Sequence, residues 1–449
     1  MHKFFPLLTI LLVSFWVSGC STMSKLNPFD EEEQKVVLQG ERQSVISFQK
    51  DLEPDDVALE AEGFIAPEAW RNDFWPQAGG YPNHAMQNLA LNSSKLKKAW
   101  TADIGEGAHK NLPLTTQPII FNDKIYTMDA DSKLSAFGIS NGKKLWEKSL
   151  RPKTEDEAVI AGGMSYSSGR LYATSGYNHV YALNPDSGKV IWQVRLEAPA
   201  RAAPTILDER VFVVTVNNHL LALNAEDGKI LWDYQGLSEQ AGLVGMASPA
   251  ANKDIVVPVF TSGEMYALRV ENGSVAWSET LSPLARSSGG LNSIADIRGM
   301  PIIDKGRVYA ASYGGKMVAL DERTGSRLWQ REIGTSETIW AAGNHLFVLA
   351  TGNEVAALGS DTGTIRWVTR LPKYADPKDK EGPLIFKGPV LAGGRLIVAG
   401  TEGRIIEIEP QNGKILREWS IGEDIIAAPV VASNALFLLT RDGKLHAFQ

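Results

Sequence analysis

A short apolar segment recurs eight times in the C-terminal four-fifths of the sequence. The copies recur about every 45 residues, a period typical of propeller blades and helical arrays. They are Leu134–Phe137, Val180–Leu183, Leu220–Leu223, Met265–Leu268, Met317–Leu320, Val355–Leu358, Ile405–Ile408 and Leu445–Phe448. A unit of this length cannot bury its apolar face alone, so each copy has to pack against its neighbours.

Each of the first six segments is followed, nine residues after its last position, by a tryptophan. These are Trp146, Trp192, Trp232, Trp277, Trp329 and Trp367. The seventh copy has Arg417 there and Trp419 two residues on, on the same strand face. A glycine stands between segment and tryptophan at a constant offset, mostly after Asn, Asp, Ser or Thr, and such pairs mark hairpin turns. The glycines are Gly142, Gly188, Gly228, Gly273, Gly325, Gly363 and Gly413.

Further apolar strands precede each hairpin, as in Arg170–Ala173 and Arg307–Ala310. Four strands per unit are typical of β-propeller blades. The eighth copy ends at Gln449 without a turn, whereas Leu96–Trp100 carries the tryptophan motif without a preceding segment. We therefore predict an all-β, eight-bladed propeller of four-stranded antiparallel blades over residues 91–449. In this prediction Leu96–Ile104 forms the outermost strand of the last blade and closes the ring, which removes open sheet edges.

The tryptophan series allows two interpretations. It could form a stack for an aromatic cofactor or a sugar, or each tryptophan could pack its blade against the next one. A cofactor site lies once on an axis and needs no residue in every blade, whereas these positions recur once per blade. We expect the tryptophans to hold the blades together.

The first residues have the features of an export signal. Lys3 is followed by an apolar run, Phe4–Val17, which is too short to span a bilayer comfortably. Residues 1–19 are therefore predicted to be a signal peptide. The run ends before Cys20, the one cysteine of the chain, and the sequence around it resembles a bacterial lipobox. The resemblance implies lipidation at Cys20, where several acyl chains give lasting membrane attachment. The alternative is an ordinary cleavage site with a stray thiol nearby.

Residues 20–90 show no sustained period and include the acidic run Asp30–Glu33. We expect a lipidated tether and an extended segment here, with a folded module as the alternative. Trp70–Tyr81 is aromatic enough to be expected to pack on the propeller.

Composition and motifs argue against several functional classes. The net charge is −7 and Lys and Arg are dispersed, which does not favour a nucleic-acid partner. The histidines lack zinc-site spacing, and the sequence has neither a Gly-x-Ser-x-Gly elbow nor a phosphate loop. Asp129-Ala-Asp131 could suggest calcium, but such a turn is more often solvated. We predict no catalytic residues, cofactor or metal site, and no enzymatic activity.

The Gly-x-x-x-Trp hairpins resemble those of pyrroloquinoline-quinone-dependent dehydrogenases and of their cofactor-free relatives. Together with the lipobox, the acidic tether and eight such blades, the chain resembles the BamB family, lipoprotein subunits of the outer-membrane β-barrel assembly machinery. The resemblance covers about residues 95–449. It implies a scaffold on the periplasmic face of the outer membrane that binds the periplasmic domains of the barrel-forming subunit, so that unfolded outer-membrane proteins are delivered and inserted. Ser21, after Cys20, agrees with outer-membrane sorting by the same analogy.

The resemblance also implies contact residues in loops between blades. Leu243 and Asp296 match the family pattern, whereas Val244 departs from it and Arg298 replaces a second acid. We take Leu243, Asp296 and Arg298 as candidate partner-binding residues, the alternative being ordinary solvated loop residues.

Two other functional classes stay open. A quinoprotein dehydrogenase would generally hold calcium and often a pair of adjacent cysteines, and one cysteine cannot form such a pair. A sugar- or peptidoglycan-binding channel is the other. The long inserts Pro283–Met300 and Pro372–Gly388 favour a protein-facing rim over that class.

Overall fold

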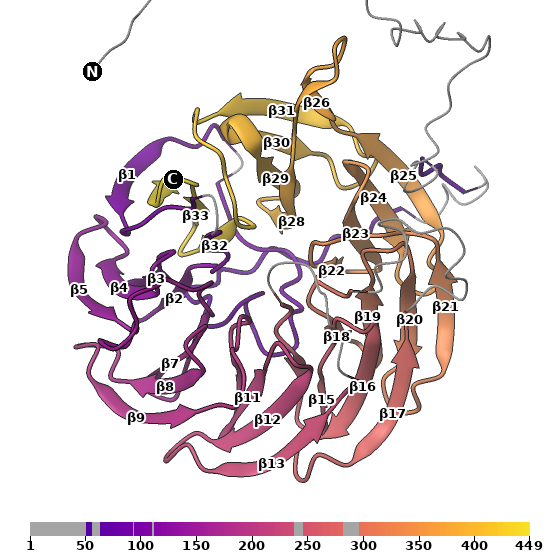
Figure 1. The fold of residues 1–449 in the computed structure, drawn as a ribbon. Helices are drawn as coiled ribbons and strands as arrows, with labels where there is room; N and C mark the ends of the chain where they lie inside the picture. Colours follow the sequence, from indigo (N-terminus) through magenta and orange to yellow (C-terminus); the bar gives the residue numbers. More distant parts are fainter. Residues whose placement is uncertain (1–50, 56–62, 93, 110–111, 238–245, 282–295) are drawn as a thin grey trace, which may run out of the picture. The chain divides into compact units, whose positions relative to one another are not determined.

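Four-stranded antiparallel sheets repeat through the computed structural model and follow one another around a ring (Figure 1). The structure describes residues 51–55, 63–92, 94–109, 112–237, 246–281 and 296–449. Within these residues eight sheets have four strands each, and one further sheet has two. Residues 46–449 cluster as one unit, and all of these sheets belong to it.

The first four blades follow one another directly along the chain. Blade 1 is β2 (Ile119–Phe121), β3 (Lys124–Met128), β4 (Lys133–Gly138) and β5 (Lys144–Ser149). Blade 2 is β6 (Met164–Ser167), β7 (Arg170–Ser175), β8 (His179–Leu183) and β9 (Val190–Arg195). Blade 3 is β10 (Thr205–Leu207), β11 (Arg210–Val214), β12 (His219–Asn224) and β13 (Ile230–Gln235). Blade 4 is β14 (Ala250–Ala251), β15 (Ile255–Val257), β16 (Glu264–Arg269) and β17 (Val275–Thr280).

The last four blades include the ring closure. Blade 5 is β18 (Ile302–Asp304), β19 (Arg307–Ala311), β20 (Met317–Asp321) and β21 (Arg327–Arg331). Blade 6 is β22 (Trp340–Ala342), β23 (His345–Ala350), β24 (Glu354–Gly359) and β25 (Ile365–Arg370). Blade 7 is β28 (Phe386–Ala392), β29 (Arg395–Gly400), β30 (Arg404–Ile408) and β31 (Ile415–Ser420), with a short 3-10 turn, η3 (Thr401–Gly403). Blade 8 is β32 (Val430–Ala432), β33 (Ala435–Leu439), β34 (Lys444–Phe448) and β1 (Lys98–Asp103).

The N-terminal strand closes the ring. β1 pairs antiparallel with β34, with Ala102 opposite Leu445 and Asp103 opposite Lys444. The predicted eight-bladed propeller and its closure by the strand around Trp100 are therefore confirmed. Because the first and last strands share one blade, the hydrogen bonds of a sheet hold the two ends of the propeller ring together.

The inner strands of each blade are buried and the outermost strand is half exposed. In blade 3, Val211, Phe212, Val213 and Val214 of β11 are all buried, whereas β13 alternates between exposed and half-buried positions. The fold therefore has its core between the blades, and its rim is formed by the fourth strands. No helix in the described part of the chain is long and apolar enough to cross a bilayer.

Each repeat tryptophan packs on the hairpin glycine of the following blade. The indole Nε1 of each donates a hydrogen bond of 2.8–3.1 Å to a backbone carbonyl at that hairpin. The donor–acceptor pairs are Trp100–Ile139, Trp146–Pro185, Trp192–Ala225, Trp232–Val270, Trp277–Glu322, Trp329–Ser360 and Trp367–Pro410. The tryptophans therefore join neighbouring blades, as the sequence predicted, and do not form a shared stack.

The interface between blades 7 and 8 uses different chemistry. Arg417 lies opposite Glu407 in the register where the other blades pair tryptophan with alanine. Blade 8 has no hairpin between its last two strands, since β34 ends the chain and β1 begins the ring, so a tryptophan at 417 would have no glycine to cover. Arg417 instead contacts Glu407 at 2.7 Å, and the buried Arg395 contacts the same carboxylate at 2.8 Å. Arg395 also donates to the Asn92 carbonyl, at the entry of the closing segment.

Residues 70–92, here called the inner circlet, pass through the centre of the ring (Figure 1). They hydrogen-bond in chain order to the innermost part of blade 8, then blades 1 to 7. The pairs are Asn72–Val431, Trp75–Ile120, Pro76–Tyr166, Gln77–Ile206, Pro82–Ala251, Asn83–Ile303, Gln87–Trp340 and Leu89–Leu391. Trp70–Tyr81 therefore packs on the propeller as expected, and the packed segment extends well beyond it.

Residues 51–55 lie along the outer edge of blade 6. The Asp55 amide donates to the Ile365 carbonyl at 2.9 Å, and Ile365 donates back to the Asp55 carboxylate at 2.7 Å. Ile365 is only 8 % exposed, whereas the equivalent Ile230 of blade 3 is 53 % exposed. This short segment therefore covers one blade edge that is open elsewhere on the ring.

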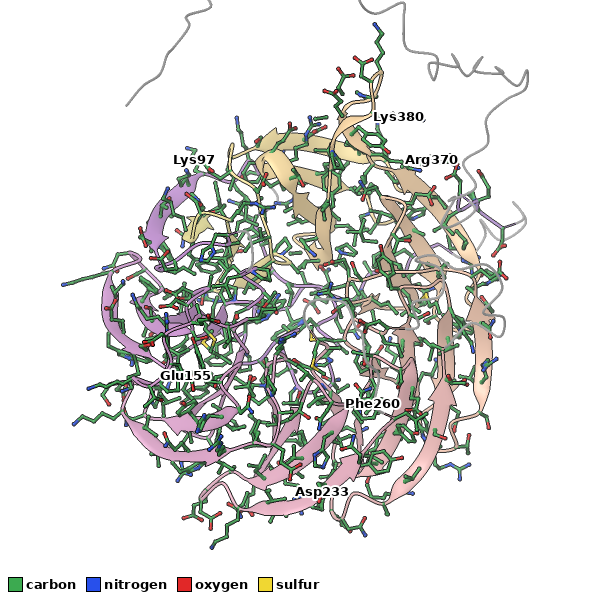
Figure 2. All side chains as sticks on the ribbon, in the orientation of Figure 1. Lys97, Glu155, Asp233, Phe260, Arg370 and Lys380 are labelled. Carbon is green, nitrogen blue, oxygen red and sulfur yellow. The ribbon has the colours of Figure 1, made fainter. Side chains whose placement is uncertain are left out.

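A two-stranded hairpin projects from the rim between blades 6 and 7. It consists of β26 (Tyr374–Asp376) and β27 (Glu381–Pro383), and Lys380 lies near its tip (Figure 2). This is the charged insert that the sequence favoured as a protein-facing element.

Candidate binding site at the channel mouth

A cavity of about 170 Å³ lies where the chain enters the innermost strand of each blade. All eight blades contribute residues to its lining, and Ala78 of the inner circlet completes it. In five blades the lining includes the residue three positions before the proline that precedes the innermost strand. Those five residues are Thr115, Arg201, Met246, Arg298 and Ile426. In these five blades the repeat therefore places the same position at the channel mouth.

The charged side chains of this lining are mostly basic. Arg201, Arg298 and Lys387 are its cations, and Glu337 is its carboxylate within the described residues. Lys387 Nζ lies 2.7 Å from Glu337 Oε1. Arg201 and Arg298 have no ion-pair partner among the described residues. The described lining of the channel mouth therefore carries an excess of positive charge, although the whole chain has a net charge of −7.

Two polar atoms of this lining are buried without a hydrogen-bond partner in the described structure. They are Arg201 Nε and Thr115 Oγ1. Native proteins leave few buried polar groups unsatisfied, and each one calls for an explanation such as a bound ion or water. Here both lie at the same cavity, in blades 1 and 3.

Gln117 connects the cavity to the inner circlet. Its Oε1 accepts hydrogen bonds from the Gly79 amide at 2.9 Å and from Trp75 Nε1 at 3.3 Å. The circlet is thereby fastened to the lining, and it occupies the channel behind the cavity. The cavity that the circlet leaves open is smaller than pockets for drug-sized ligands, which have volumes of roughly 300–1,000 Å³.

The structure separates the three candidate partner-binding residues. Arg298 lines the cavity, and Asp296 is buried at 3 % exposure. Leu243 lies outside the described residues, while Met246, three positions on, lines the cavity. Of the two described candidates, only Arg298 is within reach from the channel. The assignment of all three residues to a partner contact stays a prediction.

Arg201, Lys387 and Glu337 were missed by the sequence analysis. The position three before the blade proline could have found Arg201, because Arg298 and Thr115 share it. Lys387 and Glu337 have no such signal, since only the closing of the ring brings blades 6 and 7 against the other lining residues.

Asp129, considered for calcium in the sequence, has a structural role instead. It is fully buried, and its carboxylate accepts hydrogen bonds from the backbone amides of Glu106, Asp131 and Lys133 at 2.8–3.0 Å. The expectation that this turn is solvated is wrong for Asp129, since three amides replace water around it. Burial raises the pKa of Asp129, and the amide hydrogen bonds oppose that rise. The described residues hold no group of three or more His, Cys, Asp or Glu side chains suited to a metal.

Comparison with known proteins agrees with the propeller and adds a family. The family model described as outer membrane protein assembly factor BamB matches residues 58–161, 152–369 and 352–449. The chain belongs to the BamB family. Outer membrane protein assembly factor BamB of Escherichia coli (strain K12) is 29 % identical over 354 residues, covering 78 % of this chain and 88 % of that protein. BamB of Yersinia pestis is 28 % identical over 363 residues, with the same coverage of each chain.

Solved structures show the same fold at lower identity. The crystal structure of BamB from Moraxella catarrhalis superposes with a TM-score of 0.67 at 21 % identity, covering 79 % of this chain and all of that one. Quinohemoprotein alcohol dehydrogenase from Comamonas testosteroni gives a TM-score of 0.66 at 12 % identity, covering 85 % of this chain and 81 % of that one. The BamB family thus shares its propeller with dehydrogenases, and fold alone does not separate the two functions.

Proposed function

We propose that this chain is a non-catalytic scaffold in outer-membrane protein assembly. It binds the periplasmic domains of the barrel-forming subunit and assists the folding and insertion of β-barrel proteins. A lipid on Cys20 holds it to the periplasmic face of the outer membrane. The observation that carries the proposal is the BamB family match, which extends over residues 58–449 and so includes the inner circlet and all eight blades.

The architecture supports a scaffold that works without moving parts. The interblade tryptophans join neighbouring blades, and the closing strand β1 and the inner circlet connect parts of the chain that are distant in sequence. A ring held in this way can present loops and a channel mouth in fixed positions, and binding residues are often placed on loops above a rigid framework.

The two alternative functions have weaker support. The likeness to dehydrogenases rests on the fold at 12 % identity. A sugar-binding channel is not indicated by the relatives that match most of this chain, which are described as assembly factors. A partner contact at this end of the channel needs only single side chains to enter.

The proposal is tested by copurification of the barrel-forming subunit from envelopes with the tagged full-length chain. Arg298→Glu reverses a charge at the channel mouth, and we expect recovery of the subunit to fall severalfold. Arg323→Glu is the matched control, because Arg323 is exposed on the hairpin turn between β20 and β21. If the wild-type chain recovers none of the subunit, the proposed function is wrong. If both variants behave like wild type, Arg298 has no part in the contact.

A further inference from the structure

The channel mouth has the charge pattern of an anion site. Among the described residues three cationic side chains line it against one carboxylate, and that carboxylate is already paired with Lys387. The guanidinium groups of Arg201 and Arg298 stay without a counter-charge in the described structure. Two half-buried guanidinium groups in one small cavity repel each other, so the arrangement is stabilised when an anion lies near both.

Unsatisfied hydrogen-bond donors in the lining also indicate an anion site, independently of the charge pattern. Arg201 Nε and Thr115 Oγ1 are both buried without a partner. A buried donor without an acceptor is destabilising, because folding has removed its hydrogen bond to water. An oxyanion offers several lone pairs and accepts from guanidinium and hydroxyl donors at once.

We propose that the channel mouth binds a small oxyanion, a carboxylate or phosphate group, through Arg201 and Arg298. Lys387 and the Thr115 hydroxyl are further donors in the same lining. The cavity volume of about 170 Å³ suits one such group or the end of an acidic side chain, and is too small for a cofactor. The inner circlet occupies the channel behind it, so the group enters from the mouth.

Glu337 sets the strength of the site. Its carboxylate holds Lys387 and adds a negative charge to the lining. Removing that charge frees Lys387 and relieves repulsion of an incoming anion. Glu337→Gln therefore tightens anion binding, whereas Arg201→Gln weakens it. A general disturbance of the fold would not move the affinity in opposite directions.

The test is isothermal titration of the purified full-length chain, in detergent, with citrate and with inorganic phosphate. Sodium chloride at matched ionic strength corrects for general screening. We expect saturable binding of one anion per chain. Arg201→Gln and Arg298→Gln each raise the dissociation constant by about tenfold or more, as the loss of a charge-assisted hydrogen bond predicts, and Glu337→Gln lowers it by about threefold or more. Arg323→Gln leaves it unchanged.

The absence of binding above the chloride control overturns the proposal, as does equal binding by wild type, Arg201→Gln and Arg298→Gln. Circular dichroism and thermal midpoints identify a variant that fails to fold, and Glu337→Gln, which removes no donor to the anion, then carries the test. The isolated chain is sufficient for this experiment, so its failure is distinct from a failure of the proposed scaffold function.

A second measurement identifies the source of the oxyanion. If a partner's acidic side chain supplies it, citrate competes with copurification of the barrel-forming subunit and chloride at equal ionic strength does not. If a free anion supplies it, copurification is insensitive to citrate while titration still detects the site.

Discussion

The indole of Trp146 in blade 1 covers Gly188 in the hairpin of blade 2, and its Nε1 donates a 2.8 Å hydrogen bond to the Pro185 carbonyl of that hairpin. Gly188 has a φ of +66°, and a Cβ at this position would lie 2.7 Å from the indole. A glycine is therefore required at position 188 for two reasons. Its backbone has a positive φ, and the indole of Trp146 from the preceding blade lies too close for a Cβ.

Gly188→Ala separates these two requirements when it is compared with Gly169→Ala. Gly169 has a φ of +78° with open space around its Cβ position, so its substitution should cost only the backbone strain, about 1–2 kcal/mol. Gly188→Ala should cost about 1–3 kcal/mol more, because the indole has to move. Urea unfolding followed by tryptophan fluorescence measures both. If Gly188→Ala and Gly169→Ala lower the free energy of unfolding equally, the blades do not need this close contact.

Arg395→Met tests the buried cluster at the closing interface. Arg395 and Glu407 are 3 % and 2 % exposed, and removing one partner of a buried pair costs about 3–5 kcal/mol. Arg417 still contacts Glu407, so we expect the lower end of that range. Arg404→Met is the control in the same blade, since Arg404 pairs with the exposed Glu402 and Glu418 and should cost about 0–1 kcal/mol. Similar unfolding midpoints for Arg395→Met and Arg404→Met would show that the cluster around Glu407 does not stabilise the closed ring.

His84 in the inner circlet predicts a pH dependence of stability. Burial lowers the pKa of His84 to about 4, although its hydrogen bond to the Pro301 carbonyl opposes the shift. The unfolded chain takes up this proton near pH 6.5, whereas the folded chain does so only near pH 4. The contribution of His84 to the free energy of unfolding is therefore fully present above pH 6.5. It falls by about 3 kcal/mol as the pH is lowered from 6.5 toward 4.

The measurement is the unfolding midpoint of wild type and His84→Gln between pH 7 and pH 4. The variant should lose stability at pH 7 but show a shallower decline on acidification. His109→Gln, at an exposed histidine, should decline like wild type. Parallel curves for His84→Gln and wild type would exclude His84 as the titrating group.

Cys20→Ser tests the lipid anchor. Without acyl chains the apolar attachment is lost, since each buried methylene contributes about 0.8 kcal/mol. We expect the variant to leave the membrane fraction while its propeller keeps wild-type circular dichroism and resistance to protease. Recovery of Cys20→Ser with membranes after a salt wash would contradict the anchor. The segment at residues 51–55 should stay bound to blade 6, because its contacts to Ile365 and Arg370 do not involve the lipid.

The sequence by itself determined the number of blades and their closure. Turn glycines, strand alternation and the tryptophan positions are local patterns, and each repeats often enough to be read without coordinates. The unpaired strand around Trp100 and the missing fourth strand after Phe448 also follow from counting.

The tertiary structure decided what no local pattern encodes. Residues 70–92 thread the ring because eight of them each hydrogen-bond to a different blade, and these contacts exist only once the blades are in place. Arg417 replaces tryptophan because the closing blade has no turn to cover. Arg201, Arg298, Lys387 and Glu337 share one cavity because the ring brings together positions up to 186 residues apart, and charge excess is a property of that shared space.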